Sequence, residues 1–142
     1  MNEREFLVSR LKNLYGKGLE SVVLFGSRVR KRHAEDSDLD VIVVLNNKKN
    51  REISKIRKEF LLNFKHRLDI QVIEKSELVS NFKNFSPLFC TLVLGIRIIY
   101  DPHGIFERLF ASFVKEASKE QIKYCEKREI WDLKKRSLEI LH

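Results

Sequence analysis

Residues 26–44, which read GSRVRKRHAEDSDLDVIVV, decide the fold. A Gly-Ser pair follows one apolar run, and after ten further residues Asp38 and Asp40 stand two apart at the head of another. Side chains two apart on a β-strand point to the same side of the sheet. Two neighbouring carboxylates repel each other unless a positive charge lies between them, and a hard divalent cation prefers such oxygen ligands. The stretch therefore predicts a cation site at the start of a strand.

The same residues resemble the signature of the minimal nucleotidyltransferases, within the DNA polymerase β-like superfamily. Gly26-Ser27, ten residues, Asp38-Leu39-Asp40 and an apolar strand follow one another as in that family. The resemblance covers roughly residues 20–101. It implies a small nucleotidyltransferase sheet and transfer of a nucleotide from an NTP.

The loop between the two halves of the signature also resembles the family. Arg30 stands where the family often has Arg in a Gly-Ser-x-Ala-Arg-Gly opening, whereas Val29 and Lys31 replace the usual Ala and Gly. The second replacement affects the path of the loop rather than the acids.

Composition favours one intracellular domain with anionic partners. The chain has 142 residues and a formal net charge of +8, which favours nucleotides, nucleic acid or an acidic protein. Cys90 and Cys125 lack the spacing of a disulfide framework or a zinc site. No apolar run is long enough to span a membrane and the N-terminus lacks a signal core, so we expect a soluble, cytoplasmic protein.

Hydrophobic periodicity predicts alternating helices and strands around a small sheet. The expected helices are 2–15, 27 to about 32, about 49–65, 76–82 with Ser76 as its cap, 87 to Gly95, and a long one from Ile105. The expected strands are 21–25, 39–45, 68–73 and 97–100. Residues 39–45 place apolar side chains on both faces of their strand, so the sheet should be covered on both sides.

The fold class that follows is α/β, a small mixed β-sheet of about four or five strands flanked by helices, with an extra C-terminal helix. We expect a nucleotidyltransferase domain over residues 1–103. Residues 104–142 should form a helical extension packed on that domain or on a partner, and a homo-oligomer could form through it.

The acids suit nucleotidyl transfer, in which a hydroxyl attacks the α-phosphate of an NTP and pyrophosphate leaves. The transition state is strongly anionic, so catalysis is mostly positioning and charge neutralisation. Asp38 and Asp40 would hold two Mg²⁺ ions. Asp69 is the candidate third ligand, because a lone charge in an otherwise apolar strand is costly and because the resemblance places the third acid on this strand.

The residues that would bind the phosphates precede these acids in the sequence. Gly26, Ser27 and the amides at the start of the next helix offer N–H groups to the triphosphate, and Arg30 a charge-assisted contact. A structural alternative stays open: Gly-Ser as an ordinary turn, Ser27 as a helix cap, and the three acids as caps or ion-pair partners.

The resemblance implies a specific role for a protein of this size. Such nucleotidyltransferases are often antitoxins paired with a helical HEPN-domain toxin, and they modify a toxin tyrosine with AMP from ATP. Two alternatives remain: a non-catalytic partner-binding antitoxin or RNA-binding regulator, and an RNA 3′-end nucleotidyltransferase. Residues 28–33, a basic stretch, are compatible with RNA.

Overall fold

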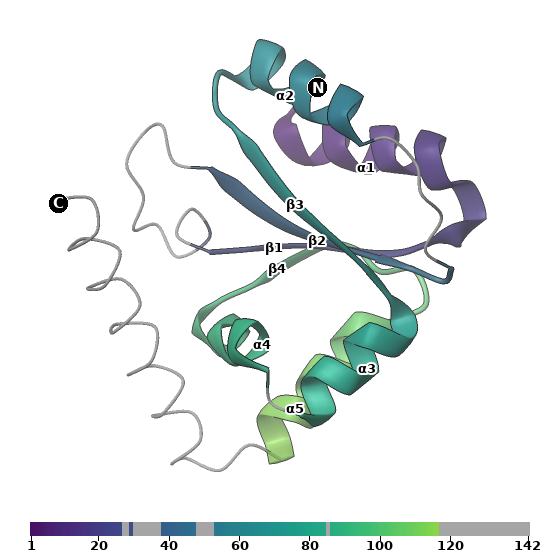
Figure 1. Cartoon of the computed structure of the whole chain (residues 1–142), viewed down its shortest axis with the longest axis vertical. Helices are drawn as coiled ribbons and strands as arrows, with labels where there is room; N and C mark the ends of the chain where they lie inside the picture. Colours follow the sequence, from purple (N-terminus) through teal and green to yellow (C-terminus); the bar gives the residue numbers. More distant parts are fainter. Residues whose placement is uncertain (27–28, 30–37, 48–52, 85, 117–142) are drawn as a thin grey trace, which may run out of the picture.

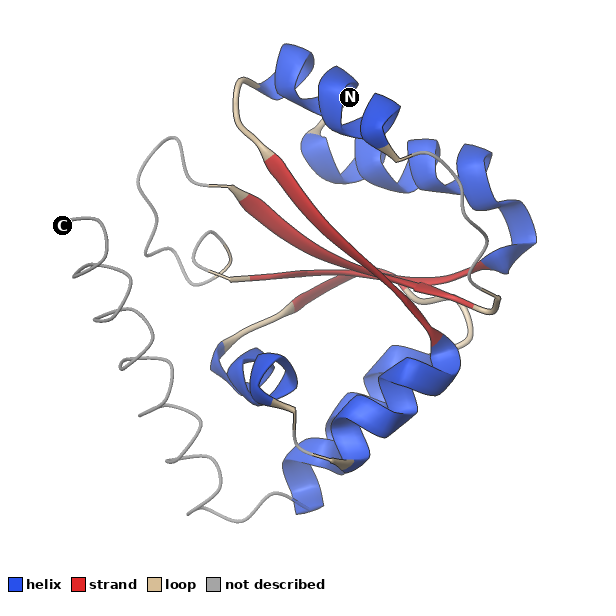
Figure 2. Cartoon of the chain, viewed as in Figure 1, coloured by secondary structure: helices blue, strands red, loops and turns tan. Residues whose placement is uncertain are grey.

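One four-stranded sheet organises the molecule (Figure 2). The computed structural model describes residues 1–26, 29, 38–47, 53–84 and 86–116. The strands are β1 (Leu19–Phe25), β2 (Leu39–Leu45), β3 (Leu68–Glu74) and β4 (Arg97–Tyr100). Their spatial order is β3-β2-β1-β4, with β1 antiparallel to β2 and β4, and β2 parallel to β3. The predicted mixed sheet is therefore confirmed.

Helices cover both faces of this sheet (Figure 1). On one face lie α1 (Glu3–Tyr15) and α2 (Ser54–Phe64), and on the other α3 (Lys75–Lys83), α4 (Pro87–Thr91) and α5 (Ile105–Glu116). Two short 3₁₀ turns, η1 (Gly16–Gly18) and η2 (Leu92–Leu94), precede β1 and β4. The layers follow from strands that are apolar on both sides and must bury both faces.

The strands divide their side chains between two hydrophobic clusters. In β2, Val41 and Val43 belong to the cluster under α1 and α2, whereas Ile42 and Val44 belong to the cluster under α3, α4 and α5. The first cluster includes Phe60 of α2, and the second includes Phe106 and the rest of the buried face of α5. This alternation fixes the face on which every strand residue lies.

Most predicted elements are confirmed, with changes at their ends. β2 and β4 have the predicted bounds, whereas β1 begins two residues earlier than expected, at Leu19. Residues 27–28, 30–37, 48–52 and 117–142 lie outside the described residues, so the expected short helix after Ser27 and the tail beyond α5 stay predictions.

The predicted cap of α3 was wrong. Ser76 is the second residue of the helix, and the N-cap is Glu74, the last residue of β3. Glu74 and Glu77 form a capping box, in which the backbone N–H of Glu74 donates to Glu77 Oε1 at 3.3 Å. β3 and α3 are thus joined without a loop. The prediction was wrong because it looked for a Ser or Thr cap, whereas the cap here is a glutamate.

Asp101 fastens α5 to the sheet. Its carboxylate accepts hydrogen bonds from Ser21 Oγ in β1 at 2.8 Å and from the backbone N–H groups of Phe106 at 3.3 Å and Glu107 at 3.0 Å. It therefore satisfies free donors at the helix N-terminus and a buried hydroxyl at once.

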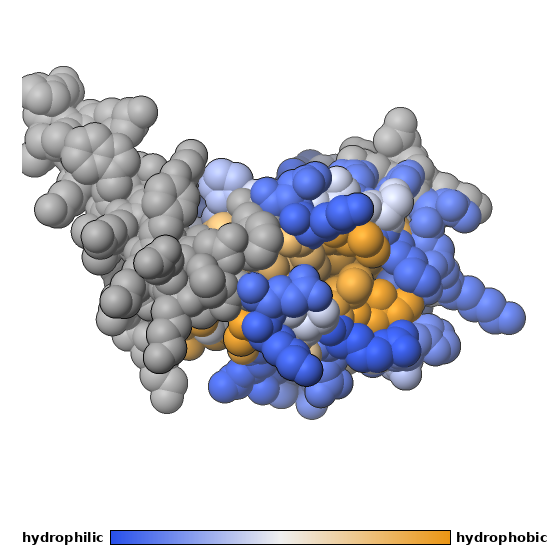
Figure 3. Space-filling model, turned by 90° about the horizontal axis from the view of Figure 1, so that it is seen from below, coloured by the Kyte–Doolittle hydropathy of each residue, from blue (hydrophilic) through white to orange (hydrophobic). Residues whose placement is uncertain are grey.

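The surface on the side of α3 and α5 is polar with an apolar patch near its middle (Figure 3). These two helices each expose one valine, Val79 and Val114. No helix in the described part of the chain has both the length and the apolar character that a membrane span requires.

Candidate active site

The acids singled out in the sequence meet at one edge of the sheet. Because β1 and β2 are antiparallel, the end of β1 lies beside the start of β2, and Phe25 pairs with Asp40. Because β2 and β3 are parallel, their starts lie side by side, and Asp40 pairs with Asp69. Two carboxylates far apart in sequence are therefore neighbours on adjacent strands, which lie about 4.8 Å apart in a sheet.

Asp40 and Asp69 also lie on the same face. Asp40 alternates with Val41 and shares its face with Ile42, which packs under α3, α4 and α5. Asp69 alternates with Ile70, which packs under α1 and α2, so it too faces the other side. Register and face together bring the two carboxylates side by side.

Asp38 completes the acidic edge from the residue just before β2. Its side chain is exposed, as is that of Asp69, whereas Asp40 is half-buried. The chain is fixed at this point, because the backbone N–H of Leu39 donates to the carbonyl of Arg67, 2.9 Å away, at the entrance to β3. Asp38 therefore stands at the open rim of the site and Asp40 deeper within it.

Gly26 packs directly against Asp40. Its φ of +82° lies in the left-handed region that favours glycine. A Cβ atom there would overlap Asp40 Oδ2 and lie 2.9 Å from Asp40 Cγ. The sequence indicates a turn at Gly26, but it does not reveal that the missing side chain makes room for the carboxylate. A glycine at the end of the strand before the paired acids is the signal that could have found this contact.

The donor set suits a hard cation. Asp40 and Asp69 offer carboxylate oxygens on one face, with Asp38 at the rim, and Mg²⁺ prefers oxygen ligands of this kind. Among the described residues, no group of three His, Cys, Asp or Glu side chains is close enough to hold a metal ion together. The structure thus supports a pair of acids, and the three-ligand site stays a prediction.

The remaining phosphate-binding candidates, Ser27 and Arg30, are not among the residues that the structure describes. The same holds for most of the basic stretch 28–33. Gly26 is the nucleotide-binding candidate that it places, at the end of β1 beside Asp40.

Comparisons with known proteins match more than half of the chain. The family model described as "Nucleotidyltransferase domain" matches residues 5–94. A relative from Methanocaldococcus jannaschii, "Putative protein adenylyltransferase MJ1305", is 35% identical over 103 residues, 68% of each chain.

Solved structures show the same fold at low identity. A chain in the "Crystal structure of the toxin-antitoxin with AMP-PNP" matches with a TM-score of 0.54 and 15% identity, over 92% of this chain and 97% of that one. A chain from a mutant of the toxin-antitoxin MntA-HpeT matches with a TM-score of 0.52 and 15% identity, over 93% and 97%.

Proposed function

Because the chain belongs to the nucleotidyltransferase domain family, we propose that it transfers a nucleoside monophosphate, AMP from ATP, to a hydroxyl acceptor. The observation that carries this proposal is the pairing of Asp40 with Asp69 on one face, beside a glycine that leaves room for the carboxylate. Like charges side by side are unfavourable, so the placement of two acids on adjacent strands supports the binding of a cation there.

In this proposal the acids hold two Mg²⁺ ions. Asp38 and Asp40 would bind both ions, and Asp69 would complete the ligands on the side of the attacking hydroxyl. When bound, the ions would supply positive charge against the anionic transition state. The chain's own part is to fix the carboxylates in register and to keep the end of β1 clear for the triphosphate.

Phosphate binding would come from the segment after β1. Gly26 turns the backbone at the end of β1, and the amides that follow, with Ser27 and Arg30, would donate to the triphosphate. Their place in the sequence, directly after a strand and before the paired acids, supports this assignment.

A protein hydroxyl is the acceptor that we propose. The support is the name of the M. jannaschii relative, a protein adenylyltransferase, and the fold shared with chains of toxin-antitoxin structures, one of which holds AMP-PNP. The acceptor would be a tyrosine of a helical HEPN-domain toxin, and this chain its antitoxin. Residues 104–142 would be the extension that contacts the toxin; their described part, α5, buries one face in the domain and exposes Val114.

The experiment uses ATP labelled at the α-phosphate, Mg²⁺, the full chain and an extract of its host. Label that protease removes from a small protein supports the proposal. Label that nuclease removes favours RNA 3′-end transfer, for which the net charge of +8 is the supporting observation.

A double variant provides the control for catalysis. Asp38→Asn with Asp40→Asn should abolish labelling, whereas Glu77→Gln, at an exposed acid on α3 whose capping oxygen the Gln retains, should leave it unchanged. If no NTP gives label with the wild-type chain and its candidate toxin, and the double variant still neutralises that toxin, the chain acts as a binding antitoxin and the catalytic proposal fails.

A further inference from the structure

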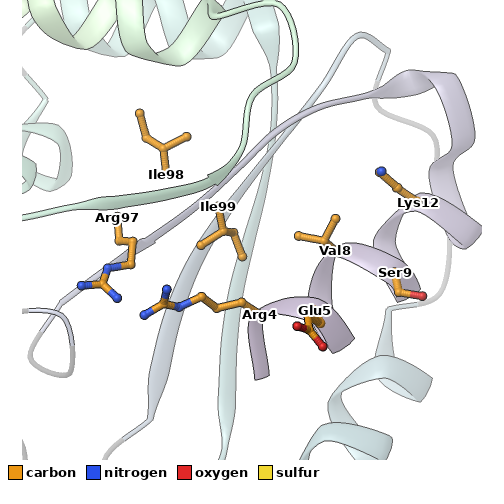
Figure 4. Close-up of a pocket in the computed structure, with 8 residues that line it drawn as sticks. All are labelled: Arg4, Glu5, Val8, Ser9, Lys12, Arg97, Ile98 and Ile99. Carbon is orange, nitrogen blue, oxygen red and sulfur yellow. The ribbon is translucent and has the colours of Figure 1, made fainter. Parts of the chain in front are cut away.

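A basic groove lies between α1 and β4, away from the acidic edge. Its volume is about 660 Å³, and the described residues that line it come from α1 and β4 (Figure 4). Val8 and Ile99 form apolar walls, and Ile99 packs with the cluster under α1 and α2. Asp40 and Asp69 lie on the opposite face of the sheet, so this groove is a separate surface.

Three cations but one acid line this groove. The guanidinium groups of Arg4 and Arg97 point toward each other in Figure 4, and within the described chain neither forms an ion pair. Lys12 lies above the ring of Tyr100, with Nζ 4.8 Å from its centroid. Glu5 is the one acid. Two guanidinium groups that face each other without a carboxylate favour an anionic partner.

β4 adds a second feature, an open backbone edge. It is the last strand of the sheet, and apart from its pairing with β1 no hydrogen bond within the described chain reaches the backbone of residues 96–100. The other edge strand is partly covered, because Arg57 Nη2 of α2 donates to the carbonyl of Ile70 in β3 at 3.4 Å. An open edge with unpaired N–H and C=O groups is a template for an added strand.

We propose that the groove and the edge of β4 together bind an extended acidic segment of a partner protein, which joins the sheet as a further strand. Backbone hydrogen bonds to β4 give the affinity. Every second side chain of the segment faces the groove, where its acidic residues meet Arg4 and Arg97 beside Val8 and Ile99. The side chains between them lie on the other face of the sheet, on the side of Ile98.

Two other occupants fit less well. Nucleic acid would use the charge but not the strand edge. A second copy of this chain, paired through antiparallel β4 strands, would set Arg97 opposite the copy's Tyr100, over which Lys12 already lies. Like charges would then meet across the interface.

The test measures binding of defined probes to the ¹⁵N-labelled full chain by amide shifts and hydrogen exchange. The probe is a capped octapeptide of alternating Val and Glu. Its matched controls are the Val-Lys octapeptide, the Val-Glu octapeptide with alternate amides N-methylated, and an eight-nucleotide oligouridylate. We expect the Val-Glu peptide alone to shift the amides of β4 and to slow their exchange by about tenfold.

Charge reversal tests the role of the two arginines. Arg4→Glu with Arg97→Glu should weaken Val-Glu binding by about tenfold or more and create binding of the Val-Lys peptide. Lys58→Glu with Lys115→Glu changes the net charge by the same amount at exposed positions of α2 and α5 and should alter neither.

Three results would overturn the proposal: equal binding of the N-methylated peptide, which would mean charge alone; shifts at β4 with the oligouridylate but not the peptide; or no shift at β4 with millimolar Val-Glu peptide. None of these measurements involves ATP or Mg²⁺, so their outcome is independent of the proposed nucleotidyl transfer.

Discussion

Asp40 in β2 and Asp69 in β3 are register partners on neighbouring parallel strands, and both side chains lie on the face of α3, α4 and α5. Like charges directly opposite each other on neighbouring strands destabilise a sheet. The edge that carries these acids thus gives up folding stability, as binding and catalytic sites commonly do.

Replacing one acid should separate stability from function. Asp69→Asn should leave the free energy of unfolding unchanged or raise it by up to about 1 kcal/mol, because it removes the repulsion. It should also abolish nucleotidyl transfer and any stabilisation by Mg²⁺ with ATP. Thermal unfolding with and without ligand, beside the labelling assay, measures both. A variant that unfolds earlier and still transfers AMP would show that Asp69 is structural.

The contact between Gly26 and Asp40 can be tested with a matched glycine. Gly26→Ala and Gly16→Ala both place Cβ on a residue with positive φ, which costs about 1 kcal/mol in each. Only Gly26→Ala meets Asp40, whereas the space around Gly16 is open. We therefore expect both variants to lose stability in urea unfolding, but only Gly26→Ala to lose transfer activity. Equal activity in the two variants would contradict the role given to Gly26.

Asp101 should matter for stability and not for chemistry. Asp101→Ala removes the acceptor for Ser21 and for two amides of α5, and we expect a loss of about 1–3 kcal/mol in the free energy of unfolding. Ser21 lies near the start of β1, at the opposite end from Gly26, so the activity of the folded fraction should stay unchanged. Asp101→Asn keeps one acceptor oxygen and should recover part of the stability. Loss of activity at full stability would instead place Asp101 in the site.

The pair formed by Glu3 and His66 should stabilise the link between α1 and the start of β3. Glu3 Oε1 lies 2.6 Å from His66 Nε2, and His66 is 7% exposed. Glu3→Ala would leave a buried ring nitrogen without its partner, which costs about 1–3 kcal/mol. Glu3→Gln keeps an acceptor and should lose less. The midpoint of urea unfolding at constant slope measures both, and an unchanged midpoint for Glu3→Ala would show that water replaces the carboxylate.

Much of the fold could be predicted from local pattern. β2 was predicted to the residue, because an acid precedes its apolar run and Asn46-Asn47 follows it. β1 was predicted two residues short, since the buried Glu20 interrupts its apolar pattern where the register with β2 shifts. A charged side chain inside a strand depends on tertiary context that no periodicity shows.

The sequence likewise indicated some of the functional candidates and missed others. Asp38, Asp40 and Gly26 became candidates because they are close in sequence, and Asp69 because a charge stood alone in an apolar strand and the resemblance pointed to the same position. The basic groove was not predicted. Its arginines, Arg4 and Arg97, are more than ninety residues apart in the sequence, and the pairing of β4 with β1 brings them together.

The side-by-side acids make transfer activity a gauge of correct folding. Side chains alternate along a strand, so a slip of one residue in β3 against β2 would turn Asp69 toward α1 and α2 and pair Asp40 with an aliphatic residue. Such a misfolded chain could keep most of its secondary structure and bury a similar core. The left-handed residue Lys65 and the anchored His66 stand just before β3 and hold its start in place. An additional residue inserted between His66 and β3, outside the acidic edge, should therefore shift this register and abolish transfer without unfolding the domain.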